Sequence, residues 1–166
     1  MRKLIVSNAM SLDDYYEGPG KNVMALFDYR SDYPTDESFD AYNAERLRAA
    51  DTLLLGRTSY DGFKGFWPSV ADDPNATPLQ REISRLNNAI DKVVISDSMT
   101  SEETNPWHNT RIISRADAHE QLAELKRQPG RERSWFLVAE HCGSTDNLTN
   151  TLIIRIRADH REITLV

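Results

Sequence analysis

The chain has 166 residues and a formal net charge of −6 at pH 7, with 39% hydrophobic and 28% charged residues. Its length corresponds to about one domain, which can bury a core without disulfides or metals. An acidic chain is poorly suited to nucleic acid, which is bound by neutralising phosphates. The longest apolar runs fall far short of the roughly 20 residues that span a bilayer. Because Cys142 is the single cysteine, no intrachain disulfide can form, and we expect a cytoplasmic protein with neither nucleic acid nor membrane as partner.

Apolar runs and helically spaced apolar residues alternate along the chain. Strands are expected over about 3–9, 52–55, 92–96, 110–113, 135–139, 151–157 and 162–166, helices over about 36–50, 58–66, 78–88 and 117–128, and a loop over 13–22. Thr35 is expected to cap the first helix, with Asp36 and Glu37 in its first turn. Thr77 followed by Pro78 indicates a second capped start.

Strands that alternate with helices predict an α/β protein with a largely parallel central sheet flanked by helices. The last two strands are joined by only four residues, 158–161. Such a short connection predicts an antiparallel hairpin, which would make the sheet mixed. There is no internal repeat or linker, so residues 1–166 are expected to form one domain. Leu4, Val6, Leu53, Leu55, Val93 and Ile95 should be buried in neighbouring strands.

The segment Gly56-Arg57-Thr58-Ser59 is the most informative for function. A buried strand ends in glycine, where a ligand can approach the backbone. The free N–H groups of a helix start favour an anion, and an arginine can bind a phosphate through two hydrogen bonds. The same residues are also compatible with a glycine turn followed by an ordinary helix start.

Two further strand ends carry polar residues. Ser96, Asp97 and Ser98 lie at the end of the third strand, and Asn8 and Asp13 lie near the end of the first. Ligands of parallel α/β sheets sit beyond the carboxyl ends of strands, so these groups either contact a ligand or form plain polar turns.

The remaining reactive side chains form no recognisable site. The four histidines, His108, His119, His141 and His160, lack metal-ligand spacing, so no metal is assigned. Cys142 has no partners in the sequence that would make it a nucleophile.

Three segments together resemble the dihydrofolate reductase superfamily. They are residues 4–13, beginning Leu4-Ile5-Val6-Ser7-Asn8, then residues 54–60 around Gly56-Arg57-Thr58, and Val93-Val94-Ile95-Ser96. The closer similarity is to the C-terminal reductase domain of bifunctional riboflavin-pathway deaminase–reductases, which residues 42–47 and 66–68 also resemble. The similarity covers residues 1 to about 130.

The resemblance implies a three-layer α/β fold and an NADPH-dependent oxidoreductase that transfers hydride to a pterin- or pyrimidine-like heterocycle. It places Gly56, Arg57, Thr58 and Ser59 at the phosphates of the cofactor, and Ser96, Asp97 and Ser98 near the adenosine 2′-phosphate. Ala9 would border the nicotinamide, and Asn8 and Asp13 the substrate. The catalytic acid stays unassigned, and a homodimer is left open.

The sequence departs from the family at Ala9, at Asp14, where glycine is usual, and after Gly130, where a Phe-Gly-Ser or Gly-Gly turn is expected. After Lys126 the chain has arginine but no lysine. Codons for residues 132–143 can be chosen so that a frame two bases later encodes Ala-Ile-Leu-Val-Phe-Gly-Ser. We hypothesise that residues 131–166 are an altered C-terminus, either produced by a frameshift or replaced in another way. The alternative functions are a degraded, non-catalytic family member and a small binding or regulatory protein with the same fold.

Overall fold

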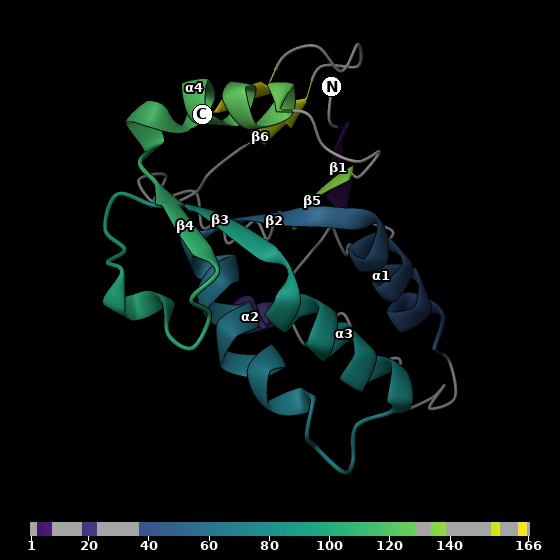
Figure 1. Cartoon of the computed structure of the whole chain (residues 1–166). Helices are drawn as coiled ribbons and strands as arrows, with labels where there is room; N and C mark the ends of the chain where they lie inside the picture. Colours follow the sequence, from purple (N-terminus) through teal and green to yellow (C-terminus); the bar gives the residue numbers. More distant parts are fainter. Residues whose placement is uncertain are drawn as a thin grey trace.

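The computed structural model describes residues 3–7, 18–22, 37–128, 134–138, 154–156 and 163–165. In chain order the elements are β1 (Lys3–Ser7), the 3-10 helix η1 (Pro19–Lys21), α1 (Ser38–Ala49), β2 (Ala50–Gly56), α2 (Arg57–Val70), α3 (Pro78–Ala89), β3 (Asp91–Ile95), the 3-10 helix η3 (Glu102–Thr104), β4 (Thr110–Ile113), α4 (Arg115–Arg127), β5 (Ser134–Val138), β6 (Ile154–Ile156) and β7 (Ile163–Leu165) (Figure 1). The expected α/β class is confirmed. Among the described helices, none has both the length and the apolar character needed to cross a bilayer.

Five strands form one sheet in the order β1-β5-β2-β3-β4, and every neighbouring pair in it is parallel. The expectation of a mixed central sheet is therefore wrong for the described strands. The antiparallel hairpin is present, but β6 and β7 pair only with each other as a separate two-stranded sheet. A short connection determines that two strands pair with one another, but it does not determine which sheet they join.

The five-stranded sheet lies between two layers of helices (Figure 1). Side chains of a strand alternate between faces, so Leu53, Leu55 and Val94 pack with the layer of α1, α2 and α3. Leu54, Val93, Ile95 and Ile113 pack on the other face against α4, through Ala118, Leu122 and Leu125. The predicted burial of Leu53, Leu55, Val93 and Ile95 is confirmed, while Leu4 and Val6 lie outside the described side chains.

The helix boundaries follow from local signals, with two corrections. α1 begins at Ser38 with Glu37 as N-cap, so the predicted cap at Thr35 is wrong, although Thr35 itself lies outside the described residues. α2 continues to Val70, beyond the expected end near residue 66, because Phe63 and Trp67 extend its packed face. At the start of α3 the predicted cap is confirmed: Thr77 Oγ1 accepts from Gln80 N at 3.1 Å, and Gln80 Oε1 accepts from Thr77 N at 3.0 Å.

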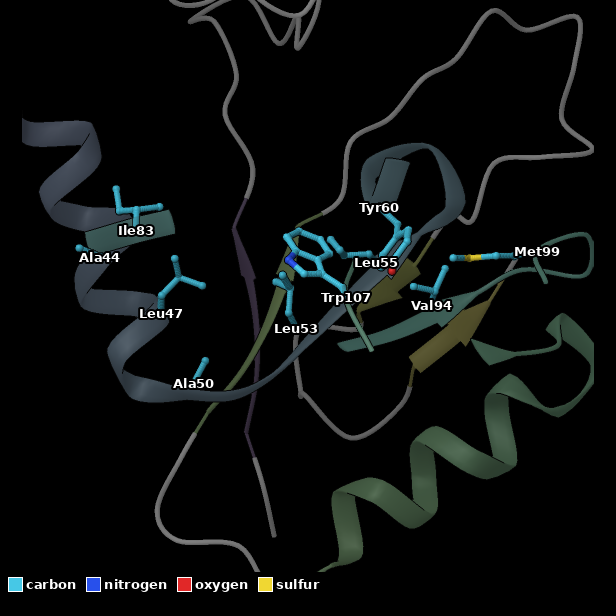
Figure 2. Packing of buried hydrophobic residues seen from close by; sticks show 10 residues of the cluster. All are labelled: Ala44, Leu47, Ala50, Leu53, Leu55, Tyr60, Ile83, Val94, Met99 and Trp107. Atoms are coloured by element: carbon cyan, nitrogen blue, oxygen red, sulfur yellow. The ribbon is translucent and has the colours of Figure 1, made fainter. Parts of the chain in front are cut away.

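The β3–β4 connection, residues 96–109, covers the same face as α1–α3 and adds Met99 and Trp107 to the core (Figure 2). The Trp107 ring meets the fully buried Tyr60 ring edge to face, with centroids 5.6 Å apart. Trp107 Nε1 donates to Asn88 Oδ1 at 2.8 Å. Burial raises the pKa of Tyr60, whose hydroxyl donates to Thr104 O at 3.1 Å. These contacts hold the connection against α2 and α3.

Lys92, near the amino end of β3, is a buried cation in this core. Its side chain is 1% exposed, and Nζ lies 4.3 Å from the centroid of the Trp107 ring. Nζ donates to Ile90 O at 2.7 Å and to Asn109 Oδ1 at 3.3 Å. Burial disfavours the charged form and lowers the pKa of Lys92 to about 8, although the charge of Asp91 acts in the opposite direction.

Candidate functional site

The carboxyl edge of the parallel sheet brings the predicted phosphate-binding segments together. Gly56 and Ile95 are partners in the β2–β3 register, so Arg57 and Ser96 follow the ends of adjacent strands. β4 ends beside them, because Ser96 N donates to Ile113 O at 3.0 Å. The two central segments predicted from the sequence therefore lie at one edge of the sheet.

Gly56 connects β2 directly to α2, and no loop separates the two elements. The backbone of Gly56 is extended, and Gly56 is the N-cap of α2. Because glycine has no side chain, it gives the helix no capping hydrogen bond. Apart from its chain neighbours, no described residue has a heavy atom within 4 Å of the place where a Cβ would stand at Gly56. The start of α2 therefore presents backbone N–H groups that no N-cap side chain satisfies, as an anion-binding helix start requires.

Arg57, the first residue of α2, already binds two carboxylates. Its Nε donates to Asp61 Oδ2 at 2.6 Å, one turn along the helix. Its two terminal nitrogens donate to the carboxylate of Glu103, at 2.5 Å to Oε1 and 3.3 Å to Oε2. The hydrogen bonds to Glu103 and then to Asp61 raise the pKa of Arg57. The guanidinium is thus positioned for an oxyanion, and in this structure the oxyanion is Glu103.

Glu103 belongs to η3, in the middle of the β3–β4 connection. Its Oε2 also accepts from the backbone N of Thr100 at 2.8 Å. These hydrogen bonds, the one from Arg57 first, lower the pKa of Glu103 to about 2. Glu103 therefore stays ionised at neutral pH and links the connection to the start of α2.

Residues of α2 at positions 57, 60, 61 and 64 form one face of the helix, which meets η3. Lys64 Nζ donates to the backbone carbonyl of Glu103, and lies 3.8 Å from Asp61 Oδ1 and 5.5 Å from the Tyr60 ring centroid. Of these four residues, only Arg57 is among the site residues expected from the sequence. The helical spacing of an arginine, a tyrosine, an aspartate and a lysine is the signal that would identify the whole face.

Ser96 and Asp97 satisfy backbone groups nearby. Ser96 Oγ accepts from Ser98 N at 3.3 Å and from Met99 N at 3.2 Å, so it stabilises the turn after β3. Asp97 Oδ1 accepts from Arg115 N at 2.8 Å, at the first residue of α4. The polar-turn interpretation thus describes these two side chains in the structure, and Asp97 would add negative charge beside a phosphate.

The other predicted site residues differ in placement. Thr58 and Ser98 are exposed, whereas Ser59 is buried. Asn8, Ala9 and Asp13 lie outside the described residues, so the structure does not place the predicted nicotinamide and substrate contacts. Within the described part of the chain, no group of three or more His, Cys, Asp and Glu side chains is arranged to hold a metal ion.

Comparison of the chain with models of known protein families gives no match, and comparison with curated proteins gives no significant match.

Proposed function

We propose that the chain is an NADPH-dependent reductase of the dihydrofolate reductase-like type, acting in the cytoplasm on a pterin- or pyrimidine-like heterocycle. The observation that carries the proposal is the carboxyl edge of the parallel sheet, where the uncapped start of α2 and Arg57 lie beside the turn that begins at Ser96. The order of the three segments that resemble that superfamily supports the same proposal.

In this proposal the chain's own residues bind and orient the cofactor, which supplies the hydride. The N–H groups at the start of α2 would hold its pyrophosphate. The guanidinium of Arg57, with Ser96 and Ser98 beside it, would hold the adenosine 2′-phosphate, and Asn8 and Asp13 would contact the heterocycle. The sheet would fix the spacing between these groups, which is how positioning contributes to rate.

The test compares titrations of NADPH and NADH, followed by quenching of tryptophan fluorescence. A charge-assisted hydrogen bond is worth roughly 1.5–3 kcal/mol, so Arg57→Ala should weaken NADPH binding by roughly ten- to a hundredfold and NADH binding much less. Arg48→Ala is the matched control, because Arg48 is an exposed arginine that precedes β2, at the opposite edge of the sheet. Equal losses for both nucleotides would show that Arg57 does not read the 2′-phosphate.

A binding or regulatory protein without a cofactor is the second candidate function. It is favoured by the ion pairs at the sheet edge, where Arg57 is bound by Asp61 and Glu103 and Asp97 by Arg115. Each charged residue of the predicted phosphate site thus has a partner within the chain. The wild-type titration separates the two functions, since a reductase must bind NADPH or NADH.

A further inference from the structure

We propose that the Glu103 carboxylate is an internal anion, which occupies the position on Arg57 that a phosphate would take. The Glu103 side chain must rotate away from Arg57 before a phosphate-bearing ligand binds. This inference rests on the proposed function, because it takes Arg57 as the residue that binds phosphate. It assigns to Glu103 the control of access to that site.

The geometry of the pair is that of a bound oxyanion. Two terminal nitrogens of Arg57 face the two carboxylate oxygens of Glu103, which is the fork arrangement that an arginine also offers to phosphate. Both ligands require the same two donors. A phosphate and the Glu103 carboxylate therefore compete for Arg57.

Only the side chain of Glu103 needs to move. The backbone of this residue is held by Lys64, which donates to its carbonyl, and the next carbonyl, of Thr104, accepts from Tyr60. Neither contact involves the carboxylate. When Glu103 leaves Arg57, the β3–β4 connection consequently stays on α2, and Trp107 keeps its place beside Tyr60.

The charges around Arg57 give the sign of the effect. Arg57 and Lys64 are cations, and Asp61 and Glu103 are carboxylates in contact with them, so the cluster is electrically neutral. Replacing Glu103 by glutamine keeps the shape but leaves one net positive charge. The variant should therefore bind an anion more tightly than the wild type does.

The experiment measures binding of NADPH and of inorganic pyrophosphate by calorimetry, for the wild type, Glu103→Gln and Glu102→Gln. Glu102 is the matched control because it is an exposed neighbour on the same 3-10 turn, and its carboxylate is hydrogen-bonded by Thr100 and Ser101. We expect Glu103→Gln to bind about three- to tenfold more tightly than the wild type. The affinity of Glu102→Gln should stay within about twofold of the wild type, since an exposed charge that is not paired with Arg57 is largely screened.

A second measurement leaves Glu103, Arg57 and Thr100 unmodified. The Thr100 amide donates to Glu103 Oε2, so its NMR shift and hydrogen exchange report the position of that carboxylate. Saturating pyrophosphate should move the Thr100 resonance and accelerate its exchange, while the fluorescence of Trp107 in a variant with Trp67 and Trp135 replaced by phenylalanine stays unchanged.

The outcomes distinguish this proposal from the proposed function. A gain in pyrophosphate affinity in Glu103→Gln, without nucleotide binding by any variant, supports the internal anion and refutes the reductase. NADPH binding that is equal in Glu103→Gln and Glu102→Gln refutes the internal anion and leaves the reductase standing. If no variant binds either probe, the internal anion is also refuted, because Arg57 would then not be an anion-binding residue.

Discussion

Replacing Lys92 with methionine should change how the stability of the protein depends on pH. Methionine fills a similar volume but carries no charge, so it removes the one cation that β3 places beneath Trp107. It also removes the donor to Ile90 O and Asn109 Oδ1. The loss of these hydrogen bonds offsets part of the stability that the variant gains by having no buried charge, but that loss does not vary strongly with pH.

The size of the pH effect follows from the pKa of Lys92. Lowering it from 10.5 to about 8 corresponds to about 3.5 kcal/mol, at about 1.4 kcal/mol per pKa unit. Below pH 8 both the folded and the unfolded chain carry the charge, and the folded state bears the whole penalty. Between pH 8 and 10.5 the folded state has released the proton while the unfolded state still holds it, so the free energy of unfolding rises with pH.

The assay is urea unfolding of the wild type and Lys92→Met, followed by circular dichroism at intervals from pH 7.5 to 10.5. The wild type should gain about 3 kcal/mol relative to the variant across this range. Taking the difference cancels the titration of Tyr60, which is common to both proteins. Lys126→Met, near the end of α4, controls for loss of a lysine outside the core. If the difference in the free energy of unfolding between the wild type and Lys92→Met stays constant with pH, burial does not penalise the charge of Lys92, and the reasoning is refuted.

Three further outcomes are expected, each measured by chemical unfolding. Thr77→Ala removes the hydroxyl that accepts from Gln80 N in the capping box of α3 and should cost about 0.5–2 kcal/mol, and a smaller loss in Thr77→Ser would identify the hydroxyl as the cause. Leu54→Ala empties a fully buried site under α4 and should cost about 2–5 kcal/mol, with no change in the helix content of the folded protein. The pKa of Glu103 is lowered to about 2 in the folded state, so its contribution to the free energy of unfolding is present above pH 4.5 and is lost as the pH falls toward 2. Glu103→Gln should therefore lose less stability than the wild type over that interval. Identical acid unfolding profiles of the two proteins would contradict the ion pair.

The central part of the fold could be predicted because its signals are local. The run from Leu53 to Leu55 and the run from Val93 to Ile95 are apolar without interruption, which is typical of parallel strands covered on both faces. Thr77 and Pro78 specified a helix start through hydrogen bonds within four residues. The hairpin's place outside the main sheet could not be predicted in this way, because it depends on contacts remote in the chain. The hypothesis of an altered C-terminus lies largely outside the described residues and stays a prediction.

For the candidate site, the sequence predicts that its two central segments lie at the same sheet edge, but it does not predict the ion pairs of Arg57. The glycine before Arg57 and the polar turn at Ser96 follow from strand ends, which the sequence marks clearly. The carboxylate that takes both terminal nitrogens of Arg57 belongs to Glu103, 46 residues away, and no periodicity connects two side chains at such a separation. The same applies to Lys92 and Trp107, which meet only because the β3–β4 connection folds back over the sheet.

The order of strands in the main sheet has a consequence for synthesis on the ribosome. β2, β3 and β4 are neighbours in both space and sequence, and can pair as soon as they emerge. β1 has β5 as its neighbour in the sheet, so β1 must wait for a strand that begins at Ser134. At translation rates of about 5–20 residues per second this wait is on the order of ten seconds. During that time β1 is an unpaired strand that a chaperone can bind, and a ribosome stalled before residue 134 would display it indefinitely.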